Sequence, residues 1–121
     1  MKVEKWMDAL KRCWEQKEYS VLEDVLADKL MYYESPFGPP LKSKAQVISQ
    51  WKTDLPKQKN ITFNYDIVKT WGNQGLVHWE ATFTRVPTSE NVGLDGVFLI
   101  KFDSEGKCIF FKQWWVVKPK E

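Results

Sequence analysis

Few side chains in this sequence could do acid–base chemistry, and two of them share one strand-like segment. His78 and Glu80 are two residues apart, so an extended strand places both on one face, where the imidazole could serve as a general base. The alternation of apolar residues in this segment puts that face on the outside of the predicted sheet. Because a general base has to reach its substrate, we interpret the pair as surface residues near an interface.

The residues that commonly bind metals or act as nucleophiles are too scattered to form a recognisable motif. Cys13, Cys108 and His78 are the only cysteines and histidine, and their spacing is not that of a zinc site. They offer no local Cys–His pair for nucleophilic catalysis. The segment from Gly93 to Gly96 lacks the third glycine of a phosphate-binding loop and leads into a strand pattern. We therefore predict no metal and no cofactor, and we expect both cysteines to be buried thiols in a reducing compartment.

Large aromatic side chains stand out in the composition of the 121-residue chain, which has 7 Trp, 7 Phe and 4 Tyr. With 43% hydrophobic residues the chain can bury one core, which predicts a single domain over residues 1–121. The formal net charge of +2 is too small to drive nucleic-acid binding. No apolar window is long enough for a membrane span, and the N-terminus has no apolar signal-peptide core. These features predict a cytoplasmic protein that binds neither nucleic acid nor membrane.

The first half of the chain is predicted to hold three helices and one strand. From Val3 to Trp14, apolar residues recur at spacings of three and four, which is typical of an amphipathic helix. Capping boxes, in which a serine precedes an acid or amide by three residues, predict the starts of two further helices at Ser20 with Glu23 and at Ser43 with Gln46. The apolar residues Val21, Leu22, Val25 and Leu26 supply the second helix, and the third ends at Pro56. A strand over residues 29–34 lies between them and stops at a proline-rich segment, 35–40.

The second half of the chain reads as a series of strands separated by turn residues. Aromatic and β-branched runs predict strands over residues 61–71, 76–86, 92–102 and 108–117. Glycine at position 106 fits the turn residue of positive φ in the last hairpin. Helices that precede such an antiparallel meander predict an α+β fold in which the helices cover one face of the sheet.

Three short motifs resemble those of a known family: residues 26–28 before the first strand, residues 35–42 after it, and residues 102–107 in the last hairpin. They are similar to the SnoaL-like branch of the nuclear transport factor 2-like (NTF2-like) superfamily. This resemblance covers nearly the whole chain and implies a cone-shaped, cystatin-like α+β fold. In that fold a strongly curved antiparallel sheet wraps around three N-terminal helices and leaves a deep cavity, usually in a homodimer. Functions in the superfamily range from isomerases, cyclases and epoxide hydrolases to non-catalytic binding proteins.

The resemblance argues against one of these activities, ketosteroid isomerisation. That family has a general base in the run that matches residues 35–38, a protonated acid at the position of Phe98, and a tyrosine near Leu10. Here Ser35, Phe98 and Leu10 stand at these places, and none of them can do that chemistry. The acid that polyketide cyclases carry near the end of the last strand has no counterpart in residues 115–118. The matched positions therefore do not decide whether the protein is an enzyme.

Strand alternation and the resemblance together predict a cavity with aromatic walls. We expect the following residues to bind a small hydrophobic, ring-containing molecule there: Trp14, Tyr33, Ser35, Phe37, Trp51, Trp79, Phe83, Phe98, Phe111, Gln113 and Trp115. The alternative is that these rings fill the cone and leave no usable space. Glu34, beside Ser35, is the candidate catalytic acid, although alternation points it away from Ser35 and a glutamate at a strand end is usually exposed.

The outer face of the predicted sheet carries a second set of apolar residues. We expect a symmetric homodimer through this face, formed by His78, Glu80, Val97, Leu99, Phe110, Trp114 and Val116. The sequence thus supports two functional hypotheses. The first is a small-molecule cavity that binds, and possibly transforms, its ligand. The second is a non-catalytic homodimeric interaction or scaffold domain that works through the outer face.

Overall fold

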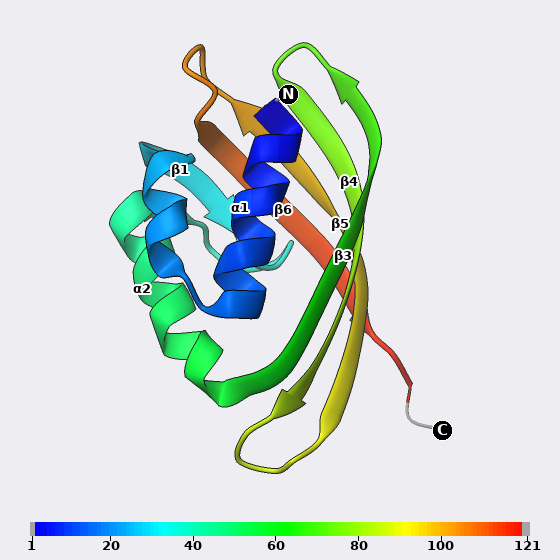
Figure 1. The fold of residues 1–121 in the computed structure, drawn as a ribbon. Coiled ribbons are helices and arrows are strands. Elements are labelled where there is room, and N and C mark those ends of the chain that lie inside the picture. Colours follow the sequence, from blue (N-terminus) through cyan, green and yellow to red (C-terminus); the bar gives the residue numbers. More distant parts are fainter. Residues whose placement is uncertain (1, 120–121) are drawn as a thin grey trace.

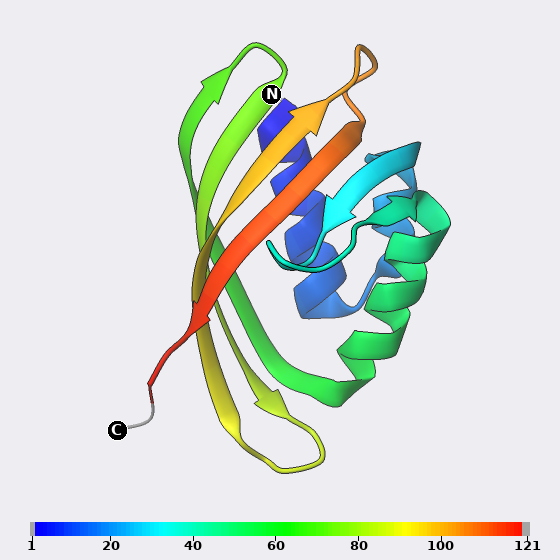
Figure 2. The ribbon, with the colours of Figure 1, turned by 180° about the vertical axis from the view of Figure 1, so that it is seen from behind.

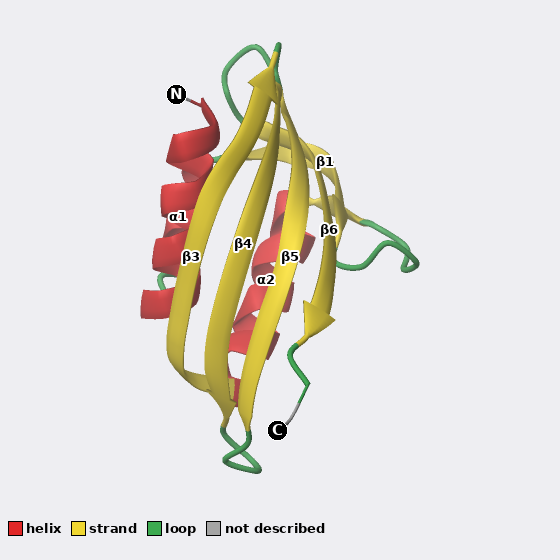
Figure 3. Ribbon diagram, turned by 90° about the vertical axis from the view of Figure 1, so that its right-hand side faces the viewer, coloured by secondary structure: helices red, strands yellow, loops and turns green. Residues whose placement is uncertain are grey.

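One strongly curved sheet wraps around the helices, which lie on its concave side (Figures 1 and 3). The structure is a computed structural model that describes residues 2–119. Its elements follow the chain in this order: α1 (Lys2–Gln16), the 3₁₀ helix η1 (Tyr19–Asp24), β1 (Leu26–Tyr33), β2 (Leu41–Ser43), α2 (Lys44–Asp54), the 3₁₀ helix η2 (Leu55–Lys57), β3 (Gln58–Trp71), β4 (Gln74–Arg85), β5 (Asn91–Phe102) and β6 (Cys108–Val117). The predicted α+β class is confirmed.

The sheet is mixed, whereas the sequence predicted an antiparallel one. Its strand order is β2-β1-β6-β5-β4-β3. The first long strand, β1, pairs in parallel with the last, β6, and Figure 2 shows the two side by side. The remaining neighbours pair antiparallel. The parallel pair joins segments that are far apart in the chain, and nothing in the local pattern of either strand shows its partner's direction.

Helix α1 packs its apolar stripe against the concave face, as its spacing predicted. Its six buried residues are Val3, Trp6, Met7, Leu10, Cys13 and Trp14. They join the core formed by the inward residues of the strands. Cys13 and Cys108 are buried free thiols, and burial raises the pKa of each thiol to about 12. Neither thiol is therefore suited to act as a nucleophile.

The predicted second helix is present only as a short 3₁₀ helix, and its predicted capping box is wrong. Residues 19–24 form only a 3₁₀ helix, whose N-cap is Glu18 and which has no side-chain cap. Leu26 already belongs to β1, where it pairs with Cys108, and the Cys108 amide donates to the Val25 carbonyl oxygen at 2.8 Å. Pairing with the last strand thus extends the chain at a point where the local pattern favoured another helical turn.

The predicted start of the third helix is confirmed in α2. The Gln46 amide donates to Ser43 Oγ at 3.2 Å, and Gln46 Oε1 accepts from the Lys42 amide at 2.7 Å. The helix passes into η2 at Leu55, and Pro56 lies within η2 rather than at a sharp end. None of the helices in residues 2–119 has the length and apolar character that a membrane crossing requires.

The long strands β4 and β5 supply most of the concave wall. On β4 the predicted inward residues Val77, Trp79, Ala81 and Phe83 are all buried. Two turn glycines adopt positive φ, Gly72 at 54° and Gly106 at 82°, as the hairpin turns require. The short strand β2 was not predicted, and β3 begins three residues before the expected position 61, because the chain extends directly from η2.

Candidate functional site

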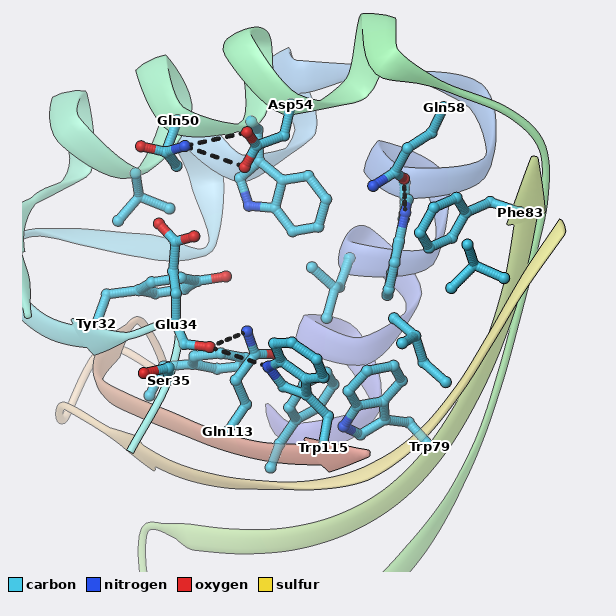
Figure 4. Close-up of a pocket in the computed structure, with 18 of the residues that line it drawn as sticks. Tyr32, Glu34, Ser35, Gln50, Asp54, Gln58, Trp79, Phe83, Gln113 and Trp115 are labelled. Carbon is cyan, nitrogen blue, oxygen red and sulfur yellow. Dashed lines mark hydrogen bonds between the residues drawn. The ribbon is translucent and has the colours of Figure 1, made fainter. Parts of the chain in front are cut away.

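A cavity of about 440 Å³ lies between α2 and the concave face of the sheet. Figure 4 shows side chains from both layers around it. Nine of the eleven residues predicted to face a ligand line this space: Trp14, Ser35, Trp51, Trp79, Phe83, Phe98, Phe111, Gln113 and Trp115. The rings pack closely on one another, but they do not fill the cone.

The apolar wall is a cluster of stacked and tilted rings centred on Trp79. The Trp79 ring stacks on Phe98, with centroids 5.0 Å apart and planes 16° apart. Trp14 lies 5.7 Å from Trp79 and 5.7 Å from Trp51, between sheet and helix. The Trp14 indole N–H donates to Gln58 Oε1 at 2.8 Å, which fixes this ring. Such interlocked rings hold the wall rigid.

Two predicted residues, Tyr33 and Phe37, do not line the cavity. In the parallel pair, Tyr32 is opposite Phe111 and Tyr33 is opposite Lys112. Tyr32 is therefore the inward tyrosine: it is buried, and its ring stacks on Phe111 at 4.3 Å. Tyr33 lies on the convex face beneath Lys112 Nζ, 5.1 Å from its ring centroid. Phe37 is 97% exposed and borders a groove on the convex side with Trp114.

The polar end of the cavity is built around residue 34. Gln113 Nε2 donates to the Glu34 carbonyl oxygen at 2.6 Å, and the Trp115 indole N–H donates to the same oxygen at 3.3 Å. The Glu34 carbonyl oxygen is thus the hydrogen-bond partner that the Gln113 side-chain amide needs on an apolar inner face. The Glu34 side chain is half-buried and lines the cavity, close to Tyr32 and Gln50 in Figure 4. The expectation that this strand-end glutamate is exposed is therefore corrected.

Ser35 has a local structural role beside this polar end. Its Oγ accepts hydrogen bonds from the amides of Phe37, at 3.3 Å, and Gly38, at 3.2 Å. It therefore caps the turn that leaves β1, although it borders the cavity. Phe98 and Leu10 stand at the other two positions of the isomerase pattern, and both belong to the apolar wall. Phe98 stacks on Trp79, and Leu10 is buried in α1.

Burial, with a smaller contribution from nearby charges, shifts the pKa values of two groups at the polar end. Burial raises the pKa of Glu34 above its ordinary value, and the Asp54 carboxylate raises it further. Burial also raises the pKa of Tyr32 well above its usual range, and the negative charge of Glu34 adds to this effect. The nearby Trp51 indole N–H acts on the pKa of Tyr32 in the opposite sense.

Several lining residues were missed by the sequence analysis: Tyr32, Gln50, Asp54, Gln58 and Arg85. One of them carried a signal, because Asp54 lies three residues after the predicted inward residue Trp51, a spacing that places both on one helical face. The Gln50 amide donates to both oxygens of Asp54, at 3.0 and 3.1 Å.

The convex face holds His78 and Glu80, the pair that could have served in acid–base chemistry. His78 Nε2 lies 3.0 Å from Asp95 Oδ1, and Asp66 approaches the other ring nitrogen to 3.9 Å. Candidate ligand atoms of His78, Glu80 and Asp95 lie within 4.8 Å of one another. Strand pairing assembles this group from β4 and β5, which sequence spacing could not show. It is partly exposed and separate from the cavity, and we assign no role to it.

The family model of the SnoaL-like domain matches residues 3–110 of the chain. No curated protein matches the sequence. Solved structures that share the fold include the following three. An NTF2-like protein from Exiguobacterium sp. superposes with a TM-score of 0.76 at 11% identity, over 99% of this chain and 100% of that one. The Δ5-3-ketosteroid isomerase of Mycobacterium sp. gives a TM-score of 0.77 at 13% identity, over 96% and 97% of the two chains. A Mycobacterium tuberculosis protein in complex with estradiol-17beta-hemisuccinate gives 0.78 at 13% identity, over 94% and 92%.

Proposed function

The chain belongs to the SnoaL-like domain family, whose model matches residues 3–110, and we propose that it binds a small hydrophobic, ring-containing molecule in its cavity. The observation that carries this proposal is the 440 Å³ space walled by aromatic rings with a few polar groups at one end. Ligand sites commonly combine apolar walls with a few well-placed polar groups. The structural relative that holds a steroid ester supports the same assignment.

The two ends of the cavity differ in polarity and should fix the orientation of such a ligand. In Figure 4 the rings of Trp79 and Phe83 lie at one end, and Glu34, Tyr32 and Gln50 lie at the other. Burial of apolar ligand surface against the rings supplies affinity, and the polar end orients the molecule. We propose binding rather than isomerisation, because the three isomerase positions carry a turn cap and two apolar wall residues. Glu34 remains the candidate for proton exchange with a bound ligand.

We expect 2-naphthol, a neutral two-ring probe, to quench the tryptophan fluorescence in a saturable way. Leu94 lines the cavity, so Leu94→Trp should fill part of it and weaken binding by about tenfold or more, because ligand and side chain compete for one space. Isothermal titration calorimetry measures the change. Val68→Trp adds the same ring at a position that is 58% exposed and should leave the affinity unchanged. Absence of saturable binding to the unmodified protein would refute the proposal.

We further propose a homodimer through the convex face of the sheet. Trp114 is 37% exposed and Val116 is 67% exposed there, and the exposed Phe37 borders the same groove. Lysines partly cover the rings: Lys112 Nζ lies 5.3 Å from the Trp114 centroid. A scaffold domain, the second candidate, would use this same face. The free buried thiols are in keeping with a cytoplasmic location, which we also propose.

Trp114→Glu should convert the proposed dimer to a monomer, because it would place one carboxylate from each subunit in an apolar contact. Light scattering at tens of micromolar protein measures the molar mass. Val86→Glu introduces the same charge at an exposed position just beyond β4 and should leave the assembly unchanged. A monomer in the unmodified protein would overturn the dimer proposal without affecting the cavity proposal.

A further inference from the structure

We infer that the polar end of the cavity recognises a positive charge, so that the ligand is a ring-containing amine or quaternary ammonium ion. This inference rests on the proposed function, since it names the chemical class that the same cavity takes. It follows from three features of the described residues: the charges that line the cavity, the use already made of its hydrogen-bond donors, and the faces of its indole rings.

The charge that lines the cavity is predominantly negative. Its titratable lining residues are Tyr32, Glu34, Asp54 and Arg85. Arg85 lies at the end of β4 and pairs with Glu90, with Nε and Oε1 3.1 Å apart. Within residues 2–119, no lysine, arginine or histidine forms a salt bridge with Glu34 or Asp54. The two carboxyl groups therefore face the cavity without a cationic partner from the protein.

Several hydrogen-bond donors around the cavity are already occupied by protein acceptors. The indole N–H of Trp14 donates to Gln58, and that of Trp115 donates to the Glu34 carbonyl oxygen. The amides of Gln50 and Gln113 donate to Asp54 and to the Glu34 carbonyl oxygen. The buried N–H of Trp79 has no partner but is closed off from water, and the adjoining edge of its ring faces Gly96. The occupied donors are not available to an anionic or carbonyl ligand.

A ring that uses its N–H edge within the protein can offer only its face to a ligand. The face of an aromatic ring is the negative part of its quadrupole and attracts cations, most strongly for tryptophan and in a site shielded from water. Trp51 and Trp115 line the cavity, and Trp115 uses its N–H edge within the protein. Ring faces and two carboxyl groups together can replace the water that a cation loses on entry.

The protonation state of Glu34 should make cation binding depend on pH. Burial and the Asp54 carboxylate both raise the pKa of Glu34, which favours its neutral form. The other titratable groups that line the cavity are Tyr32 on the same strand and Arg85 at the end of β4. A cation beside Glu34 favours the ionised form and lowers that pKa. Cation affinity should therefore rise as the pH rises through the pKa of Glu34, with release of a proton on binding below it.

The test compares phenyltrimethylammonium with tert-butylbenzene, a neutral molecule of the same shape, by fluorescence titration of the full chain from about pH 4 to about pH 8. A quaternary ammonium has no titratable proton, so any pH dependence reports on the protein. We expect the ammonium probe to bind about tenfold more tightly at the upper pH, and its preference to shrink toward the lower pH.

Glu34→Gln keeps the size of the side chain and removes its charge. It should lower the affinity for phenyltrimethylammonium about tenfold, remove most of the pH dependence and leave tert-butylbenzene binding unchanged. Glu105→Gln makes the same charge change in the exposed turn between β5 and β6 and should have no effect. Equal binding of the two probes, or full ammonium binding in Glu34→Gln, would overturn the inference and leave the proposed function standing. If neither probe binds and 2-naphthol also fails, the proposed function itself falls.

Discussion

Trp79→Ala is expected to lower the free energy of unfolding by about 3–5 kcal/mol. Trp79 is 1% exposed and contacts the rings of Trp14, Phe63 and Phe98. Removal of its indole leaves a void among rings that are held from both layers, so the wall cannot collapse easily to fill it. Since domains of this size have total stabilities of about 5–15 kcal/mol, the loss is a large share of the whole.

Urea denaturation followed by far-ultraviolet circular dichroism measures this loss. Trp71→Ala removes the same side chain at the end of β3, where it is 41% exposed, and should cost less than about 1 kcal/mol. If Trp79→Ala does not fold, Trp79→Phe provides a milder variant: it keeps a ring and removes an indole N–H that has no partner. Equal losses for Trp79→Ala and Trp71→Ala would contradict the central position of Trp79 in the core.

The second large effect is expected at Gly96, on β5 opposite Trp79. An added Cβ would meet the backbone carbonyl oxygen of Trp114 and would lie 2.9 Å from both Cε2 and Cζ2 of Trp79. The carbonyl belongs to the neighbouring strand and cannot rotate away, so β5 and β6 would have to separate locally. We expect Gly96→Ala to lower the free energy of unfolding by about 3 kcal/mol, near the upper end for overpacking.

Gly38→Ala is the matched control, because its new Cβ would make only an ordinary contact with Ser35 Oγ at 3.5 Å. It should change stability by less than about 0.5 kcal/mol. Thermal unfolding of both variants measures the difference. Near-ultraviolet circular dichroism should also change for Gly96→Ala alone, because the ring beside the new methyl group is Trp79. A stability of Gly96→Ala equal to that of the unmodified protein would show that the strands can separate at no cost.

The parts of the fold that the sequence predicted well are those with a local cause. The stripe of α1 and the alternation on β4 were read correctly, because each element buries one face and exposes the other. The α2 start was also readable, because Ser43 and Gln46 make their hydrogen bonds within a few residues. The aromatic wall followed from these elements, and nine residues that line the cavity, seven of them aromatic, were named in advance.

The errors arose where a distant strand decides the outcome. The parallel register of β1 on β6 turns Tyr32 inward and Tyr33 outward, and it extends the chain at Leu26. Glu34 lies just beyond the last residue of β1, so strict alternation no longer applies to it. Its place in the cavity instead depends on its backbone carbonyl, which accepts hydrogen bonds from two residues of β6. The two bonded pairs are 79 and 81 positions apart in the chain. No local pattern predicts contacts over such a separation.

The parallel pairing of β1 with β6 also has a consequence for the order of folding during synthesis. The β3–β4–β5 meander can form as soon as those residues have left the ribosome, since each strand pairs with the one before it. β1 leaves the ribosome much earlier, but it lacks its central partner until residues 108–117 have been made. Until then its inner side chains, Leu30 and Tyr32 among them, have no completed sheet to cover them. The chain thus carries an exposed strand edge through most of its translation, a state that favours aggregation and chaperone binding.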